Sequence, residues 1–575
     1  MNRNTESHFA QLPAAEIQRS TFDRSASYKS SFNAGRLIPF YVEEVLPGDT
    51  FDITTSKIVR SQTMLTPVMD NMYLDTYYFF VPNRLVWDHW REFCGENTQG
   101  PWAPTVSYRM PTIASPEGGF AVGTIADYMG LPVGVTWKAD DDLAPTSLPF
   151  RAYSLICNEF FRDENLSDPL LTPTDDANSQ GVNTGNYVTD CALGGLPFRP
   201  AKYHDYFTSA LPAPQKATEP VGIPIDVPGF NGGVFPVVTS ANVNPLPVKP
   251  MVMWVGGSNA SNDYTITDGT KRSIYYDGTG GAYHGGNDPA SNGYASAAAP
   301  GNLVVDIPAA GNSSTIGFNV NEMRLAFAYQ RFLESLARNG SRYTELLLGL
   351  FGVRSPDARL QRPEYLGGNR VPVNVSEVTN TAQAEQDFLG DLGAKSTTSD
   401  VNHDFVKSFT EHGYLIGLMC VRYDHSYHQG FQRFWMRKKF EDFYNPKFAH
   451  LGEVPVWQAE IYTDGGNLKP AAGETQPPIF GYQEIWADYR YRPNMVTGEM
   501  RPGVTNSLAT WNLADQYAKA PTLSDGWIRE SVDNVDRVLA VTSSVANQFW
   551  CDIYVRNKCT RPMPMYSIPG LIDHF

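Results

Sequence analysis

The chain has 575 residues, of which 42% are hydrophobic, 13% aromatic and only 18% charged, and its formal net charge at pH 7 is −16. This length and apolar content support a sizeable core, whereas the acidic balance excludes a protein that neutralises nucleic acid by itself, because phosphate binding needs clustered Lys and Arg. The longest near-apolar runs, 346–353 and 414–421, are far too short for a membrane span, and we expect none. The polar amino terminus lacks the apolar stretch of a secretory signal, which favours a chain made in a cytoplasm.

The six cysteines are scattered, apart from the last two. No C-x-x-C pair occurs, so neither a zinc ribbon nor a thioredoxin-type site is indicated. Single cysteines spread through so large a chain are typical of free, buried thiols in a reducing compartment. They are Cys94, Cys157, Cys191, Cys420, Cys551 and Cys559.

Short strand-like runs dominate the chain, separated by loops rich in its 48 glycines and 42 prolines. Each run is aromatic or β-branched, and several alternate polar with apolar residues, as strands with one buried face do. Many short strands joined by long Pro/Gly loops predict a sandwich or barrel. The runs occupy residues 37–45, 50–60, 71–82, 413–423, 454–462 and 548–556.

Two helices are expected between the strands. The shorter one spans Arg151 to Arg162, and the longer one begins near Asn319 and stops at Asn339-Gly340. The motif N-V-N-E at the start of the longer helix supplies an N-cap residue and a glutamate three positions later, and Asn-Gly is a normal C-terminal signal. The apolar stripe of this helix predicts that it packs on the core. That stripe consists of Met323, Ala326, Phe327, Leu333 and Leu336, with Leu325 and Phe332 widening it.

Residues 212–312 differ in composition from everything around them. Gly, Ala, Asn, Ser and Pro dominate, and charge is sparse. Such a long insertion is tolerated where it projects from a stable scaffold, because loop-closure entropy grows slowly with length. Two β-like pieces, VFPVVTS (234–240) and MVMWVGG (251–257), favour a small, outward β-rich excursion; disorder is the competing interpretation.

Seven long blocks, spread in order over nearly the whole chain outside 217–312, carry a specific signal. They are NAGRLIPFYVEEVLPGDTF (33–51), MDNMYLDTYYFFVPNRLVWDHW (69–90), YHDYFTSALPAPQK (203–216), RYTELLLGLFGVRSPDARLQRPEYLGG (342–368), FGYQEIWADYRYRP (480–493), DRVLAV (536–541) and RPMPMYSIPGLIDHF (561–575). These blocks resemble the major capsid protein of the microviruses (Microviridae), small tail-less phages with single-stranded DNA, and specifically the gokushovirus branch.

The resemblance implies a mainly β fold, an eight-stranded antiparallel jelly roll of the viral capsid type with long insertions and a few short helices. It also implies sixty copies in a T=1 icosahedral shell, and a variable insertion that forms protrusions at the threefold axes, proposed to meet the host surface. The implied organisation is an N-terminal arm (1–32), a first part of the jelly-roll core (33–211), the insertion (212–312), a second part of the core (313–560) and an extended tail (561–575).

The resemblance further implies the partners of the chain: copies of itself, a packaged circular single-stranded DNA, other virion proteins and a host receptor, with assembly in the bacterial cytoplasm. Because the chain is acidic, most neutralisation of a genome must come from a small basic DNA-binding protein, polyamines or metal ions. Two interpretations of the arm stay open, an arm inside the shell and an ordinary frayed terminus. Its charges are Arg3, Arg19, Arg24 and Lys29 against Glu6, Glu16 and Asp23.

The carboxyl tail is predicted to lie extended in subunit contacts. Pro562, Pro564 and Pro569 exclude a helix, and the tail is too apolar for a free, solvated end. We expect it to pack along its own or a neighbouring subunit. The residues expected at this interface are Pro562, Met563, Met565, Tyr566, Ile568, Leu571, Ile572 and Phe575.

The segment RFWMRKK combines basic and aromatic residues. Such a mixture is able to bind single-stranded DNA, with bases stacked on the rings and phosphates paired by the cations. The competing interpretation is a subunit interface or solvated face, since Glu441 and Asp442 follow at once. The residues considered for DNA contact are Arg433, Trp435, Arg437, Lys438 and Lys439.

Candidate metal ligands are weak, and no cofactor is expected. His425 and His428 in DHSYH resemble a ligand pair, but residues three apart on a strand face opposite sides. The triplet Asp140-Asp141-Asp142 is compatible with a structural divalent cation, and a solvated turn is the alternative.

Catalytic motifs are absent from the sequence: it contains no G-x-S-x-G, no H-E-x-x-H and no G-x-x-x-x-G-K-[ST]. We therefore expect a structural protein and no enzyme. Two alternatives remain at this stage, a receptor-attachment or lectin-like spike protein and a β-sandwich carbohydrate hydrolase, whose carboxylate pair would carry no sequence mark.

Overall fold

The computed structural model divides the chain into two compact units. Unit 1 comprises Met1–Ala217 and Phe332–Phe575, and unit 2 comprises Thr218–Arg331. The residues that the structure describes are 18–97, 107–216, 320–340, 342–379 and 392–566, together with six short strands between 237 and 305.

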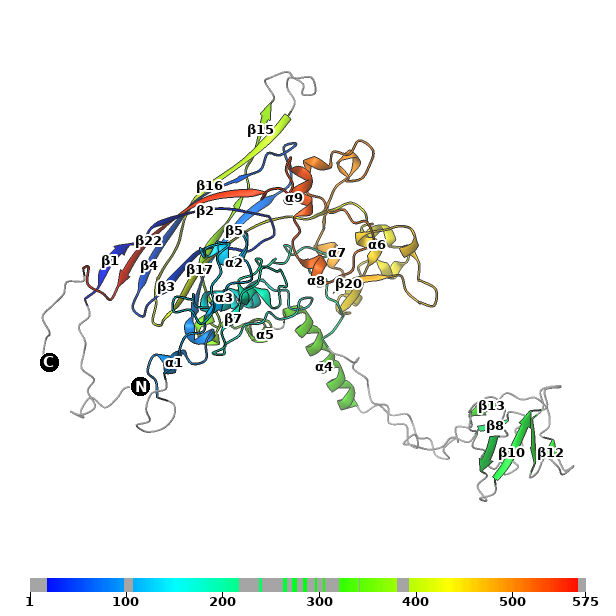
Figure 1. Cartoon of the computed structure of the whole chain (residues 1–575). Helices are drawn as coiled ribbons and strands as arrows, with labels where there is room; N and C mark the ends of the chain where they lie inside the picture. Colours follow the sequence, from blue (N-terminus) through cyan, green and yellow to red (C-terminus); the bar gives the residue numbers. More distant parts are fainter. Residues whose placement is uncertain are drawn as a thin grey trace. The chain divides into compact units, whose positions relative to one another are not determined.

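Two antiparallel sheets form the centre of unit 1 (Figure 1). In the first sheet, one edge of β22 pairs with β1 and β2, its other edge pairs with β4, and β16 and β15 follow β4. In the second sheet the strand order is β14-β5-β17-β3. The first sheet consists of β1 (Ser20–Asp23), β2 (Ala26–Phe32), β4 (Thr50–Ser61), β15 (Val375–Thr379), β16 (Leu392–Ser408) and β22 (Phe549–Arg561). The second consists of β3 (Ile38–Val45), β5 (Met72–Pro82), β14 (Glu364–Pro372) and β17 (Gly413–Tyr423).

The chain passes repeatedly from one sheet to the other. When the strands of the two sheets are numbered along the chain without the short β1 and β15, the order is 1-8-3-6 in the first sheet and 5-4-7-2 in the second. Two packed antiparallel sheets connected in this way have the topology of a jelly roll. The predicted mainly β, antiparallel fold with few helices is confirmed.

The core between the sheets is built by alternating side chains. On β22 Phe549, Ile553 and Val555 are buried, and they pack in one cluster with Leu74 of β5 and Leu415 of β17. Such alternation places every second residue on the buried face, which is why these runs were recognisable in the sequence. The predicted runs at 37–45, 50–60, 71–82, 413–423 and 548–556 correspond to β3, β4, β5, β17 and β22.

The predicted strand at 454–462 is wrong in its second half. Strand β19 (Glu453–Trp457) ends at Trp457, and the chain turns into α6 (Gln458–Ile461). The buried Glu460 side chain accepts a hydrogen bond from the Trp457 backbone N–H at 2.9 Å, which stabilises that turn. Alternation of polar and apolar residues gave no hint of a buried carboxylate at this position.

The second sheet is covered on its outer side as well. Phe79 of β5 and Leu418 of β17 lie in a second cluster with Leu148 and Tyr153 of α3 (Leu148–Ile156). The chain continues from α3 into a π-helical turn, η3 (Cys157–Phe161). The predicted helix at 151–162 and its packing on the core are therefore confirmed, with a start three residues earlier.

The longer predicted helix is α4 (Val320–Asn339), followed by α5 (Tyr343–Phe351). The helix itself is confirmed, but core packing along its full stripe is wrong. Leu333 is buried, whereas Phe327 and Phe332 are exposed and Leu325 is 70% exposed. No helix among the described residues is long and apolar enough to cross a membrane.

Residues 424–530 form a loop-rich region with its own small core. Tyr206 and Phe207 pack there with Tyr427, Val456 and Phe480. Its elements are β18 (Ser426–Tyr427), η6 (Arg433–Met436), η7 (Phe440–Asp442), η8 (Pro446–Phe448), β19, α6, η9 (Gly466–Leu468), β20 (Ile479–Glu484), α7 (Ala487–Arg490), β21 (Asn494–Met495), η10 (Gly498–Met500), η11 (Ala509–Trp511) and α8 (Asp525–Ile528). The remaining elements of unit 1 are η2 (Asn83–Leu85), α1 (Trp90–Phe93), β6 (Ile113–Ala114), α2 (Ile125–Tyr128), β7 (Ser179–Gln180), η4 (Asp190–Leu193), η5 (Asp357–Leu360) and α9 (Asp533–Val538).

Unit 2 contains two small antiparallel sheets within the predicted insertion. One has the order β12-β11-β10-β9, and β13 pairs with β8 in the other. The β-like piece at 234–240 contains β8, whereas the piece at 251–257 lies outside the described residues. The strands are β8 (Val237–Thr239), β9 (Asn262–Thr265), β10 (Lys271–Tyr276), β11 (Tyr283–Gly286), β12 (Ala295–Ser296) and β13 (Leu303–Val305).

Candidate functional site

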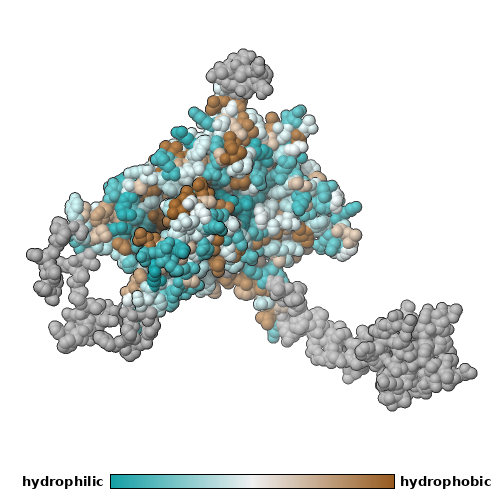
Figure 2. Space-filling model, viewed as in Figure 1, coloured by the Kyte–Doolittle hydropathy of each residue, from teal (hydrophilic) through white to brown (hydrophobic). Residues whose placement is uncertain are grey.

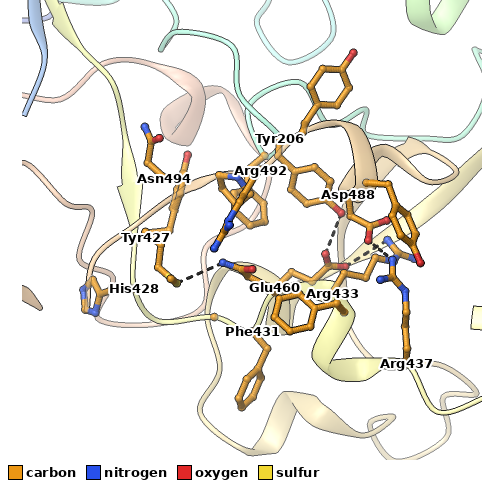
Figure 3. A pocket seen from close by; sticks show the side chains of 18 of the residues that line it. Tyr206, Tyr427, His428, Phe431, Arg433, Arg437, Glu460, Asp488, Arg492 and Asn494 are labelled. Carbon is orange, nitrogen blue, oxygen red and sulfur yellow. Dashed lines mark hydrogen bonds and ion pairs between the residues drawn. The ribbon is translucent and has the colours of Figure 1, made fainter. Parts of the chain in front are cut away.

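The basic and aromatic segment 433–439 lies in the loop-rich region and borders a cavity of about 330 Å³ (Figure 3). Its first arginine points inward. Arg433 Nη1 donates to the Pro455 carbonyl oxygen at 3.0 Å and lies 3.5 Å from the buried Glu460 carboxylate. Burial raises the pKa of Glu460, and the charge of Arg433 partly opposes this shift.

The second arginine of the segment is also engaged within the subunit. The Arg437 guanidinium forms an ion pair with Asp488, donates to the Asp442 carbonyl oxygen at 2.9 Å, and lies 4.2 Å from the ring centroid of Tyr489. An arginine held by a carboxylate and a ring has little capacity left for a phosphate. The structure therefore gives Arg433 and Arg437 internal roles.

The other three residues face outward. Trp435 is 71% exposed and packs on Phe434 with ring centroids 4.8 Å apart. The side chains of Lys438 and Lys439 are exposed, while their backbone N–H groups donate to Asp442 Oδ2 at 2.7 and 2.8 Å. Among the described residues, neither lysine has an ion pair, so Trp435 and the two lysines are free to contact a partner.

The cavity beside this segment is lined by aromatic rings and by charged side chains. Phe431, Phe434 and Tyr491 line it together with two arginines that have no ion pair among the described residues, Arg492 and Arg501. These two arginines were not predicted as site residues, because they lie about 60 residues from the basic segment and no local pattern connects the two stretches. Such a cavity suits a planar or aromatic group, and its volume is at the low end for small-molecule sites.

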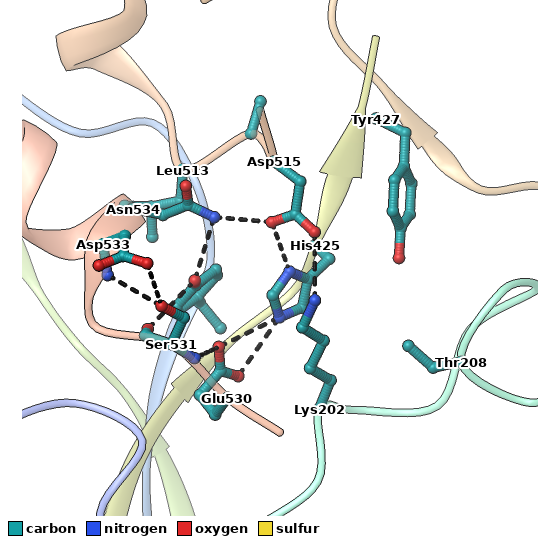
Figure 4. A network of polar contacts seen from close by, with 12 residues as sticks. Lys202, Thr208, His425, Tyr427, Leu513, Asp515, Glu530, Ser531, Asp533 and Asn534 are labelled. Carbon is teal, nitrogen blue, oxygen red and sulfur yellow. Dashed lines mark hydrogen bonds and ion pairs between the residues drawn. The ribbon is translucent and has the colours of Figure 1, made fainter. Parts of the chain in front are cut away.

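The two histidines that resembled a ligand pair do not share a site: Figure 4 shows the surroundings of His425, and Figure 3 shows His428 beside the cavity. His425 is buried, with Nδ1 2.8 Å from Asp515 and Nε2 3.2 Å from Glu530, so both ring nitrogens have carboxylate partners. Lys202 lies 3.3 Å from Asp515 and completes a buried group of two cations and two anions. His428 instead lines the cavity, and its Nε2 has no hydrogen-bond partner within the described part of the chain.

This buried group sets the charge of His425. Burial disfavours its protonation, but the Asp515 and Glu530 carboxylates outweigh that effect and raise its pKa to about 9. The pKa of Asp515 is correspondingly lowered: burial opposes this, and the neighbouring His425 and Lys202 charges prevail. The group joins segments that lie far apart in the sequence, and its arrangement indicates a structural role.

The aspartate triplet 140–142 stabilises a turn. Asp141 accepts a hydrogen bond from the Lys138 backbone N–H at 2.7 Å, and Asp140 accepts one from the Asn178 side chain at 3.3 Å. Among the described residues, no group of three or more His, Cys, Asp or Glu side chains is suited to a metal ion. These contacts fit the turn interpretation of the triplet.

The described part of the carboxyl tail lies on the surface. Strand β22 ends at Arg561, which pairs with Asp49 at 3.1 Å, and beyond it Met563 and Met565 are exposed and Tyr566 is 76% exposed. These residues find little cover on their own subunit. The other tail residues expected at an interface, Ile568, Leu571, Ile572 and Phe575, lie outside the described residues.

Helix α5 and the part of α4 that belongs to unit 1, from Phe332 on, present a second set of exposed apolar side chains. Figure 2 shows that apolar residues lie at several places on the described surface. Phe351 at the end of α5 is 73% exposed, and Tyr343 and Leu348 are exposed on the same helix. Exposed apolar patches on a folded subunit usually mark contacts with another protein. This surface was missed in the sequence because the stripe of α4 looked like that of a core helix.

Comparison with known proteins gives a consistent result over the whole chain. A family model described as "Capsid protein (F protein)" matches residues 10–571. The chain is 37% identical to the capsid protein VP1 of Chlamydia phage 1, with 98% of each chain covered. It is 38% identical to capsid protein VP1 of Spiroplasma virus 4 (98% of this chain, 97% of the relative) and 36% identical to that of Bdellovibrio phage phiMH2K (100% and 99%).

Proposed function

The chain belongs to the phage capsid protein (F protein) family, and we propose that sixty copies of it close into a T=1 icosahedral shell around a circular single-stranded DNA genome. As a capsid protein it is a structural component of the virion, not an enzyme, and it assembles with copies of itself. The observation that carries the proposal is the similarity to three phage capsid proteins over almost the full length of every chain. The jelly-roll topology supports it, because viral capsid domains commonly use this fold.

Subunit contacts are proposed at the two exposed apolar surfaces. One is the tail beyond β22, with Met563, Met565 and Tyr566 exposed, and the other is the α4–α5 surface around Phe351. Each contact can be modest in a closed shell, because symmetry repeats it and closure makes the contacts cooperative.

Contact with the packaged DNA is proposed for Trp435, Lys438 and Lys439, the outward-facing part of segment 433–439. A few lysines per subunit cannot balance a genome when the chain itself carries a net charge of −16. We therefore infer that a small basic DNA-binding protein, or polyamines or metal ions, accompanies the capsid protein in the virion, together with other virion proteins.

Residues 212–312 are proposed to form a protrusion at the threefold axis that contacts the host receptor. The short antiparallel sheets of unit 2 support a built β-rich excursion in this segment. Assembly is proposed to take place in the cytoplasm of the bacterial host. A separate receptor-attachment protein is disfavoured, because the relatives that match over the full chain are named capsid proteins.

The size of the expressed, purified protein tests the proposal. Sixty chains of 63.8 kDa give particles of about 3.8 MDa, visible by negative-stain microscopy and measurable by light scattering. Icosahedral particles of this mass are the expected result. A protein that stays a monomer or small oligomer, alone and when co-expressed with the other virion proteins, would disprove the shell, and hydrolysis of glycans would revive the hydrolase alternative.

A further inference from the structure

The outer face of the first sheet is an extended surface over which none of the described helices lies. On β22 the even-numbered side chains Trp550, Asp552, Tyr554, Arg556 and Lys558 are exposed, while the odd-numbered ones are buried. The neighbouring strands β4 and β16 continue this face, and none of the described helices lies over it in Figure 1. The four long strands of this sheet therefore present one open side.

The open face carries an excess of positive charge, although the chain as a whole is acidic. The exposed side chains of this face include five cations and three carboxylates. One cation, Lys29, pairs with one carboxylate, Asp552, at 3.3 Å. The other four cations have no ion pair among the described residues: Arg60, Lys395, Arg556 and Lys558. The two remaining carboxylates, Asp23 on β1 and Asp52 on β4, stand opposite Lys558 in the strand register. Asp23 also accepts a hydrogen bond from the Ser25 backbone N–H, and Asp52 lies 3.5 Å from His403.

Two aromatic rings stand among these charges. Trp550 is 45% exposed and Tyr554 is 47% exposed, and the strand places both on the same side. Trp550 lies directly opposite Arg60 on β4, and Arg556 follows Tyr554 on the same side of β22. Hydroxyl groups of β4 and β16, such as those of Thr54 and Ser56, lie on this face and are able to donate hydrogen bonds to phosphate oxygens. The same face also exposes the apolar side chains of Ile58, Val401 and Val406.

We propose that this face binds the packaged single-stranded nucleic acid and is therefore the inner side of the subunit in the shell. Bases stack on Trp550 and Tyr554, while Arg60, Lys395, Arg556 and Lys558 pair with phosphates. Ring stacking and phosphate pairing are open to every base, so we expect binding to be independent of sequence. The inference rests on the proposed function, since it needs a shell with a genome inside.

The cations and the rings make separable contributions to binding, which gives the first experiment. Binding of a fluorescent oligothymidylate to the full chain is measured by anisotropy over a range of salt concentrations. In the variant with Arg60, Lys395, Arg556 and Lys558 all changed to Gln, the slope of log K against log salt should become shallower by about 3. In Trp550→Ala with Tyr554→Ala, affinity should fall about tenfold or more while the slope stays unchanged.

A matched control removes the same charge from other parts of the surface. Lys138, Lys447, Lys469 and Lys519 are exposed, and changing all four to Gln should leave affinity and slope near those of the unaltered chain. The inference is overturned if both variants of the sheet face bind like the unaltered chain, or if the control loses as much as they do. Circular dichroism on each variant verifies that the fold persists.

A second measurement uses the unaltered protein in particles and so does not depend on the folding of any variant. Particles filled with bromodeoxyuridine-substituted DNA are irradiated, and crosslinked peptides are mapped. Crosslinks in β22 at Trp550 or Tyr554 are expected; crosslinks confined to 433–439, or protein–protein contacts covering the sheet face, would overturn the inference. If no particles form at all, the shell proposal fails, and the oligonucleotide data still decide whether the face binds DNA.

Discussion

The two sheets of unit 1 differ in what covers them. The second sheet is buried on both sides, with Leu415 facing the first sheet and Leu418 facing α3. The first sheet is buried only on the side that faces the second sheet, so that Ile553 is covered and Tyr554 is exposed. Strand β17 is accordingly a continuous apolar run, whereas β22 alternates strictly. Because the first sheet is covered on one side only, its other side is available for a partner.

The largest effect is expected from the tail that continues from the open sheet. Deletion of residues 562–575 keeps Arg561 and its ion pair with Asp49, so the subunit should stay folded and soluble. Shell assembly should be abolished, because the exposed Met565 and Tyr566 would be lost from their contact. Electron microscopy and light scattering measure the particles, with Met563→Leu plus Met565→Leu as a control that should assemble. Normal particles from the truncated chain would remove the tail from the interface.

The covered side of the second sheet should be far more sensitive to truncation of a ring than the open side of the first. Phe79→Ala leaves a cavity against Phe160 and Phe161 and should lower the free energy of unfolding by about 3–5 kcal/mol. Tyr554→Ala on the open side should change it by less than about 0.5 kcal/mol. Urea unfolding of the soluble subunit compares the two; equal losses would contradict the difference between the sheets.

The buried charges beyond the end of β17 predict a loss of stability at high pH. The pKa of His425 is about 9 in the folded chain and near 6.5 when unfolded, so its charged form is favoured by folding. This contribution, about 3 kcal/mol, is complete below pH 6.5 and declines as the pH rises to 9 and beyond. Unfolding measured from pH 6 to 10 should show the decline, and exposed His403→Gln should not alter it. A flat profile would mean that His425 is neutral in the folded chain.

The smallest effects are expected from substitutions in segment 433–439, where Arg437 is held within the subunit and Lys438 and Lys439 are exposed. Arg437→Gln leaves Asp488 without its cation and should lower the free energy of unfolding by about 2 kcal/mol. Lys438→Gln with Lys439→Gln should change the free energy of unfolding by less than about 0.5 kcal/mol, because both side chains are exposed. The same double variant should reduce the DNA content of particles, measured by absorbance, because the two lysines are proposed to contact the genome. Unchanged DNA content would assign the lysines to the outer surface or to a subunit contact.

The sequence by itself determined the family, the fold class and the strands with a strong apolar pattern. Strands β3, β4, β5, β17 and β22 were predicted because each has at least one apolar face, and such a pattern has a local cause. Strand β16 was missed, since its inward residues include Ser396 and Thr398, which are buried without being apolar. The start and end of α4 were predictable from its capping residues, but its exposure was not.

Only the tertiary structure decided which charged side chains are available to a partner. Arg437 and Lys438 are neighbours in the sequence, yet Arg437 is held by Asp488 while Lys438 is exposed. His425 looked like half of a ligand pair and proved to be bound by Asp515 and Glu530, about a hundred residues away. Local patterns record which face of a strand is buried, because burial follows the period of the backbone. They carry no record of pairings between distant segments, because those depend on how the loops return to one another in the folded chain.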